Sequence, residues 1–132
     1  VSFVDGATGK ISHNYLHLQR ALFNSDLSAS KKVAASLSES LTDERKSLKM
    51  IAENMAAAES LKTIRSQFSA FTNEVESLIT DALTAGTIYK QFCPMAEDNN
   101  GAYWLADVKD IRNPYFGDRM AKCGKTISSI SK

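Results

Sequence analysis

The chain has 132 residues, 43% of them hydrophobic, and its 16 basic and 15 acidic residues leave a formal net charge of +1. This length suits one domain that buries a core without needing a metal or disulfides to fold. A near-neutral charge argues against a protein that binds nucleic acid or anionic membranes. The apolar runs are far shorter than the ~20 residues that span a bilayer. We therefore expect a single soluble domain over residues 1–132.

Apolar residues recur at helical spacing in four successive segments. These segments are 10–24, 25–42, 42–58 and 60–85. In the first, the apolar positions from Ile11 to Leu22 fall on one stripe at intervals of four, three and four residues. Ser25 or Asp26 is placed to cap the second helix, and Gly86 to end the fourth. Because short links favour antiparallel neighbours, we predict an all-α fold, an up-down four-helix bundle over about residues 10–86.

The sequence changes character after Gly86. Residues 87–124 contain both prolines and the only tryptophan, which indicates loops and short extended pieces. A turn is expected at Asn99-Asn100-Gly101, and Asp118 to Lys122 fit one last helical turn. We expect this irregular C-terminal segment to pack against the bundle.

Sulfur is concentrated in the same segment as two short pairs, Cys93-Pro94-Met95 and Met120-Ala121-Lys122-Cys123. Spacing of two residues in an extended stretch, or of three on a helical turn, places both side chains on one side. If the two segments meet, four soft ligands converge, and thiolate and thioether ligands select Cu(I). We therefore take Cys93, Met95, Met120 and Cys123 as candidate metal ligands.

Other interpretations of these sulfurs stay open. Methionine also fills irregular gaps around aromatic rings. A disulfide between Cys93 and Cys123 would stabilise an irregular tail by about 3 to 4 kcal/mol in the loop-entropy model. Two cysteines are equally compatible with buried free thiols, and their number alone does not choose among these states.

The two histidines give a weaker metal signal. His13 and His17 are four residues apart on the first predicted helix, a spacing that suits a metal site. Both fall opposite the apolar stripe, which favours solvated side chains. His17 lies nearer the edge of the stripe and is kept as a possible additional ligand.

No motif for catalysis is found. The sequence lacks G-x-S-x-G, P-loop, dinucleotide-binding and H-E-x-x-H patterns. Its histidines have no evident nucleophile partner, and Asp107, Asp110 and Asp118 lack the spacing of a calcium loop. We expect no enzymatic activity and assign no catalytic residue.

Four stretches of the chain carry a recognisable pattern. They are Tyr15-Leu-His-Leu-Gln-Arg-Ala-Leu22, Phe92-Cys-Pro-Met-Ala96, Gly101-Ala-Tyr-Trp-Leu105 and Arg112-Asn-Pro-Tyr-Phe-Gly-Asp-Arg-Met-Ala-Lys-Cys-Gly124. The pattern resembles an uncharacterised family of exported bacterial domains, found alone or joined to membrane-fusion (adaptor) proteins of copper and other heavy-metal efflux systems. The C-P-M and M-x-x-C-G elements of the family fall on Cys93 to Met95 and on Met120 to Gly124. His17 and Gln19 depart from the family's first helix, so no family role is carried onto His17.

The resemblance implies a location outside the cytoplasm and an efflux adaptor or other periplasmic protein as partner. Val1 in place of methionine indicates a mature or trimmed chain, so any signal peptide or lipid anchor would not be seen in this sequence. An oxidising compartment favours the disulfide, whereas the efflux association favours copper. We predict a periplasmic Cu(I)-binding module of heavy-metal efflux or resistance.

The alternative prediction is a non-catalytic interaction module in which Cys93 and Cys123 form a structural disulfide. Four aromatic residues of the tail then build a docking surface or pack the tail onto the helices. These residues are Tyr103, Trp104, Tyr115 and Phe116.

Overall fold

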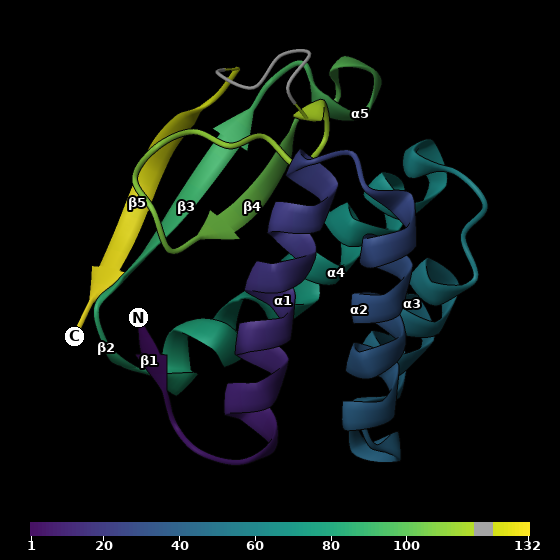
Figure 1. Cartoon of the computed structure of the whole chain (residues 1–132). Coiled ribbons are helices and arrows are strands. Elements are labelled where there is room, and N and C mark those ends of the chain that lie inside the picture. Colours follow the sequence, from purple (N-terminus) through teal and green to yellow (C-terminus); the bar gives the residue numbers. More distant parts are fainter. Residues whose placement is uncertain (118–122) are drawn as a thin grey trace.

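The computed structural model describes residues 1–117 and 123–132, in which a layer of helices packs against a small antiparallel sheet (Figure 1). The helices are α1 (Ala7–Phe23), α2 (Leu27–Ser40), the 3-10 helix η1 (Asp43–Arg45), α3 (Lys46–Ala56), α4 (Leu61–Ala82) and the single turn α5 (Ala96–Asn99). The strands are β1 (Ser2–Phe3), β2 (Leu83–Ala85), β3 (Thr87–Cys93), β4 (Ala102–Ala106) and β5 (Lys125–Ser131). No helix in this part of the chain is long and apolar enough to cross a membrane.

The four long helices follow the periodic segments predicted from the sequence. Their apolar stripes are buried together in one core. The Asp26 carboxylate caps α2 by accepting a hydrogen bond from the Ala29 backbone N–H at 2.9 Å. The Ser60 hydroxyl caps α4 by accepting one from the Thr63 backbone N–H at 3.1 Å. The starts of α2 and α4 are therefore set by local side-chain chemistry, and Asp26 is one of the two caps that the sequence predicts for the second helix. Helices α1 and α3 have no side-chain cap.

The end of α4 differs from the prediction. The helix stops at Ala82 instead of continuing to Ala85, and the next three residues form β2. This strand pairs antiparallel with β1, so the N-terminal residues lie beside the end of α4. Gly86 follows with φ of 98°, a left-handed backbone that few other residues adopt.

The predicted all-α class is wrong, because the protein is mixed α and β. The irregular tail expected over residues 87–124 instead contributes β3 and β4 to a three-stranded sheet of order β4-β3-β5. Strand β3 pairs with β4 from Tyr89–Ala106 to Cys93–Ala102 and with β5 along its other edge. The turn signal at Asn99–Gly101 does mark the connection between β3 and β4. The predicted helical turn at residues 118–122 lies outside the described residues.

The sheet is covered on both sides at its β3 and β4 strands. On one side, Lys90 forms an ion pair of 2.9 Å with Glu76 of α4. The next residue, Gln91, points to the other side, where its amide nitrogen donates to the Lys109 backbone carbonyl at 3.1 Å. Its amide oxygen accepts a hydrogen bond from the Trp104 indole N–H at 2.8 Å, and both side chains are fully buried. Residues after β4 thus fold back over the sheet.

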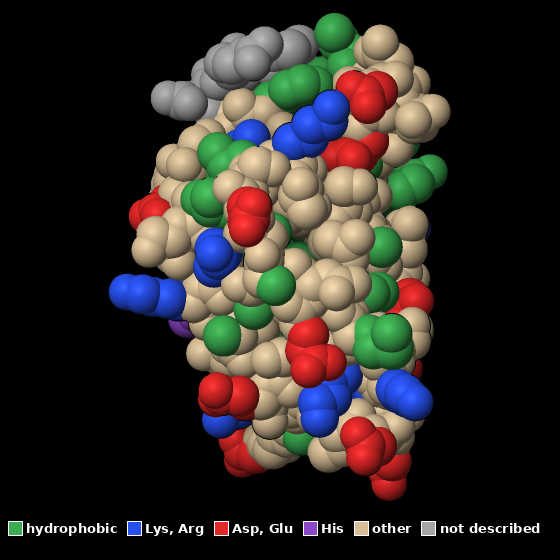
Figure 2. Space-filling model, turned by 90° about the vertical axis from the view of Figure 1, so that its right-hand side faces the viewer, with side chains coloured by type: hydrophobic (Ala, Val, Ile, Leu, Met, Phe, Trp, Pro, Cys, Tyr) green, Lys and Arg blue, Asp and Glu red, His purple; other side chains and the backbone are tan. Residues whose placement is uncertain are grey.

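The outer surface carries charges of both signs. Figure 2 shows acidic and basic side chains interspersed over the face on the right of Figure 1. This distribution agrees with the formal net charge of +1. That face therefore has no strong single-sign field to attract a polyanion.

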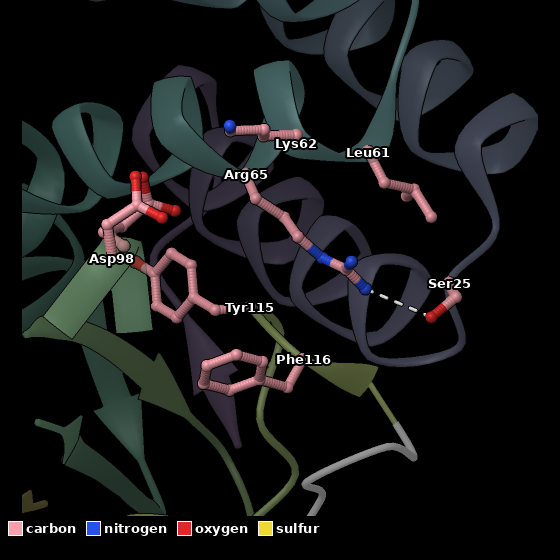
Figure 3. Close-up of a pocket in the computed structure, with 8 residues that line it drawn as sticks. Ser25, Leu61, Lys62, Arg65, Asp98, Tyr115 and Phe116 are labelled. Atoms are coloured by element: carbon pink, nitrogen blue, oxygen red, sulfur yellow. Dashed lines mark hydrogen bonds between the residues drawn. The ribbon is translucent and has the colours of Figure 1, made fainter. Parts of the chain in front are cut away.

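Arg65 of α4 ties the segment of residues 107–117 to the helices. Its Nε donates to the Pro114 backbone carbonyl at 2.8 Å. One of its terminal nitrogens donates to the Leu22 carbonyl at 2.9 Å and to the Ser25 hydroxyl at 3.1 Å (Figure 3). One half-buried guanidinium therefore joins the end of α1, the start of α4 and the segment after β4.

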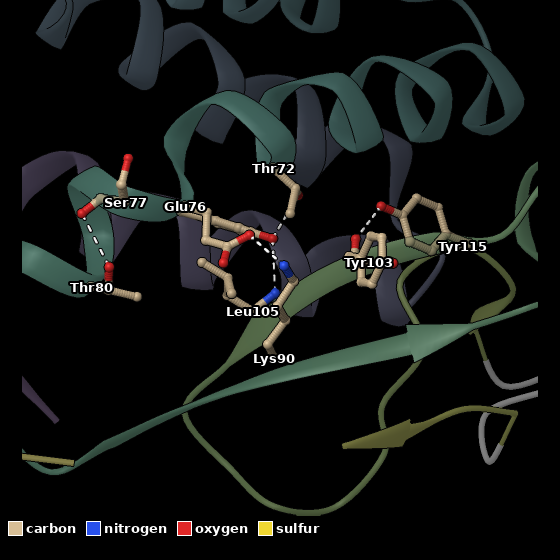
Figure 4. Close-up of polar contacts among 9 residues, drawn as sticks. Thr72, Glu76, Ser77, Thr80, Lys90, Tyr103, Leu105 and Tyr115 are labelled. Carbon is tan, nitrogen blue, oxygen red and sulfur yellow. Dashed lines mark hydrogen bonds and ion pairs between the residues drawn. The ribbon is translucent and has the colours of Figure 1, made fainter. Parts of the chain in front are cut away.

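Two tyrosine hydroxyls satisfy the outer edge of β4. The Tyr15 hydroxyl accepts a hydrogen bond from the Leu105 backbone N–H at 3.1 Å and lies 2.7 Å from the Thr72 hydroxyl. The Tyr115 hydroxyl donates to the Tyr103 carbonyl at 2.6 Å (Figure 4). A buried strand edge would otherwise leave these backbone groups unpaired. Burial raises the pKa of both tyrosines above the ordinary value.

Removal of the Tyr15 hydroxyl tests this junction. We expect Tyr15→Phe to lower the free energy of unfolding by about 1–3 kcal/mol, because the Leu105 N–H is then buried without an acceptor. Urea denaturation measures the change. Tyr89→Phe is the matched control, because within the described residues the Tyr89 hydroxyl makes no hydrogen bond. Equal effects of the two substitutions would contradict the assignment.

The same tyrosines make stability depend on alkaline pH. A native pKa above the ordinary tyrosine value of 10.0 means that the unfolded chain releases these protons first. Their contribution is full below pH 10.0 and is lost as the pH rises toward the native pKa, so stability falls in alkali. The expected slope is about 1.4 kcal/mol per pH unit for each tyrosine. Urea unfolding between about pH 9 and 11 measures it, and Tyr15→Phe should reduce the slope by one tyrosine's share.

Candidate functional site

The two cysteines meet at one end of the sheet. Cys93 is the last residue of β3, and Cys123 lies two residues before β5. Because β3 and β5 are antiparallel neighbours, with Phe92 opposite Lys125, this register brings the two thiols together. The sulfur atoms lie 2.6 Å apart and both thiols are free. Cys93 is fully buried, whereas Cys123 is partly exposed.

A buried asparagine holds the backbone at Cys123. The Asn113 amide nitrogen donates to the Cys123 carbonyl at 2.9 Å, and its amide oxygen accepts from the Tyr115 backbone N–H at 2.8 Å. Asn113 is completely buried. In the sequence, Asn113 belongs to the Arg112 to Gly124 stretch of the family resemblance and precedes Pro114, which predicts extended backbone, but neither observation identifies its hydrogen-bond partners. This supporting residue therefore has no signal that spacing or periodicity reveals.

The next residue, Gly124, passes close beneath the sheet. Its φ is 135°, and a Cβ atom there would lie 2.9 Å from the Trp104 ring and 3.0 Å from the Phe92 carbonyl. A larger residue would push the chain away from β3. The glycine therefore allows Cys123 to approach Cys93.

The Cys93 thiol disfavours ionisation of Cys123. The pKa of Cys123 is raised, chiefly by its hydrogen bond with the Cys93 thiol and then by burial and by repulsion between the two sulfurs. The Met95 backbone N–H acts in the opposite direction, because it donates to the Cys123 sulfur. Two adjacent thiolates repel each other, so the pair favours a shared proton, a covalent bond or a bridging cation.

The predicted methionine ligands are not equally well placed. The extended stretch ends at Cys93, and Met95 has φ of −90° and ψ of −8°, a helical conformation. The two side chains therefore do not follow the extended geometry expected for Cys93 and Met95. Met95 is 46% exposed beside the pair. Met120 lies outside the described residues.

His13 and His17 do not belong to a group of candidate metal ligands within the described residues. His13 and His17 are both exposed on α1, and the His13 ring packs edge-on against Phe3 with centroids 5.0 Å apart. Residues 1–117 and 123–132 contain no group of three or more His, Cys, Asp or Glu side chains suited to a metal ion. A metal at the thiol pair would need methionine or an external ligand to complete its shell.

The aromatic residues of the tail mainly fill the interior. Trp104 is fully buried and Tyr115 is 5% exposed, with ring centroids 6.1 Å apart. Tyr103 is exposed at 36% and Phe116 is half-buried. Of the two roles expected for these residues, packing of the tail describes Trp104 and Tyr115.

Comparison with known proteins finds a family match for the helical part of the chain. A family model described as protein of unknown function (DUF3347) matches residues 11–85, more than half of the chain. The chain belongs to the DUF3347 family. No curated protein and no solved structure matches it. The DUF3347 match runs from α1 to the end of β2, so both cysteines lie beyond the matched residues.

Proposed function

We propose that the domain is a periplasmic module that binds Cu(I) through the thiolates of Cys93 and Cys123 and serves heavy-metal efflux or resistance without catalysis. The observation that carries the proposal is the convergence of two thiols, 30 positions apart in the sequence, to a separation of 2.6 Å. Thiolates are the ligands that soft ions select.

The donor set fits a soft monovalent cation. The Cys93 thiol beside Cys123 raises the pKa of Cys123 and so disfavours its ionisation. A cation between the sulfurs removes this repulsion and makes both thiolates favourable. With metal–sulfur bonds of ~2.3 Å, the sulfurs would need to separate to ~4 Å. Cys123 lies outside β5, so this movement leaves the β3–β5 pairing intact.

Met95 is the proposed third ligand. Its exposed side chain follows Cys93 by two residues, and its backbone N–H already contacts the Cys123 sulfur. Met120 is retained as a fourth candidate because it precedes Cys123 by three residues. A thioether completes a soft shell without adding charge.

The proposed location and partner rest on sequence resemblance. The C-P-M and M-x-x-C-G elements resemble those of exported domains that occur with efflux adaptors. We propose export, with a lipid anchor on the full-length precursor as one form of attachment, and an efflux adaptor or other periplasmic protein as partner. An oxidising compartment also bears on the state of the thiols.

A second candidate is a structural disulfide in an interaction module, and the short distance between the sulfurs favours it. A bond of about 2.05 Å requires only a small approach of the two atoms. Oxidised glutathione accepts the two electrons and two protons, so the products are one protein disulfide and two reduced glutathione molecules. The two candidates describe different redox states of the same pair.

Titration with Cu(I) under anaerobic, reducing conditions tests the metal proposal. We expect one ion per reduced chain, competition with a colorimetric Cu(I) chelator, and at least 100-fold weaker binding by the Cys93→Ser, Cys123→Ser double variant. Affinity should fall on acidification, because protons compete for the thiolates. Met95→Leu tests the third ligand. Binding by the wild type no tighter than by the double variant would refute the role.

Oxidation of the metal-free protein tests the second candidate. We expect a disulfide to raise the free energy of unfolding by about 3.5 kcal/mol, because it closes a loop of 30 residues in the unfolded chain. Urea unfolding with and without reductant measures the difference. The double serine variant controls for general effects of the reductant. If the wild type keeps its free thiols in the presence of oxidised glutathione, the structural disulfide is excluded.

A further inference from the structure

A pocket lies between the start of α4 and the turn α5. It has a volume of about 560 Å³, within the range of small-molecule sites. Lys62 and Arg65 of α4 line one part of it, and Glu97 and Asp98 of α5 another. The aromatic side chains that line it are Tyr115 and Phe116. In the view of Figure 3, Asp98 and the Arg65 guanidinium lie on opposite sides of the Tyr115 ring.

The charges around this pocket are separated. Within residues 1–117 and 123–132, the ion pairs are Arg20–Asp107, Lys49–Asp43 and Lys90–Glu76, so none joins the basic and acidic sides of the pocket. Opposite charges that share a cavity without touching leave both signs available to a ligand.

Arg65 has spare hydrogen-bonding capacity. Its Nε and one terminal nitrogen are used by protein acceptors. The second terminal nitrogen carries two more N–H groups, for which the described residues provide no acceptor. A guanidinium fixed on one side and open on the other is suited to bind a carboxylate.

The acidic side of the pocket is held by a strained turn. Glu97, Asp98 and Asn99 have φ values of 54°, 56° and 67°, so three consecutive residues other than glycine are left-handed. Each such residue costs on the order of 1 kcal/mol or more. The turn places two carboxylates at the pocket despite this cost, and strain of this kind clusters at ligand sites.

Arg65 is short of counter-charge at this pocket. Burial lowers the pKa of Arg65, and the Glu97 carboxylate acts only to raise it. The guanidinium has therefore lost water, and a ligand carboxylate would supply a counter-charge.

We propose that this pocket binds a small zwitterion, an ammonium carboxylate with an apolar side chain such as a free amino acid or a short peptide. The ligand carboxylate binds Arg65 and Lys62, its ammonium group binds Asp98 and Glu97, and its apolar part lies against Phe116. Cys93, Met95 and Cys123 do not line the pocket, so the ligand proposed here occupies a different site from the metal.

Calorimetric titration with L-phenylalanine and with the dipeptide L-leucyl-L-phenylalanine tests the proposal. We expect at least one probe to bind with a Kd of 1 mM or tighter, about −4 kcal/mol. The stronger probe identifies the amino acid or the peptide as the source. N-acetyl-L-phenylalanine and L-phenylalanine amide each lack one charge, and each should bind at least tenfold more weakly than phenylalanine.

Substitutions on the two sides of the pocket provide the matched test. Asp98→Asn and Lys62→Gln should each weaken binding at least tenfold. Asparagine tolerates a left-handed backbone, so the first substitution preserves the turn. Lys49→Gln removes a surface cation that does not line the pocket and is paired with Asp43, so it should leave binding unchanged. The double serine variant of the cysteines should bind as the wild type does, which separates this site from metal binding. No binding of either probe at 10 mM, or equal binding by the pocket and control variants, would overturn the proposal.

Discussion

The arrangement of helices and sheet depends on the hydrogen bonds of the Tyr15 hydroxyl. Tyr15 of α1 is fully buried. Its hydroxyl lies beside the Thr72 hydroxyl of α4 and accepts a hydrogen bond from the Leu105 backbone N–H of β4. A sheet edge inserted into a helical core needs such partners, because water cannot reach its backbone groups. Tyr115 satisfies the neighbouring carbonyl, and among the described residues no buried side-chain nitrogen or oxygen lacks a partner. With β4 fixed, β3 and then β5 are positioned in turn.

The helical layer was predictable because its information is local. A stripe such as that from Ile11 to Leu22 repeats over several turns, and the caps at Asp26 and Ser60 lie beside the helices that they start. The sheet was not predictable by the same means. Strand β3 alternates polar and apolar residues imperfectly, with Lys90 and Gln91 both engaged by other elements. Strand β5 is exposed along its whole length, so its conformation comes from backbone pairing with a strand 32 or more residues earlier.

The candidate sites also combine features that the sequence reveals with features that only the tertiary structure reveals. Cys93 and Cys123 are recognised as reactive side chains from their residue type, and the sequence is compatible with both a shared metal site and a disulfide between them. Their meeting is set by strand register, and Asn113 supports it through two hydrogen bonds that no motif encodes. Arg65 is one polar residue on an amphipathic helix, and only tertiary structure reveals that it joins three segments. Glu97 and Asp98 gain their positions from backbone angles that composition does not disclose.

The exposure of β5 has a consequence for the dynamics of the thiol pair. This strand buries little side-chain surface, so the hydrogen bonds to β3 supply most of its local stability. Segments of this kind open by sub-global fluctuation at a lower free energy than the core. Fraying of β5 would proceed toward Cys123, whereas Cys93 stays in the protected strand. Opening of β5 is therefore a second route by which the two sulfurs separate, and the exchange rates of the β5 amide hydrogens report how often the strand opens.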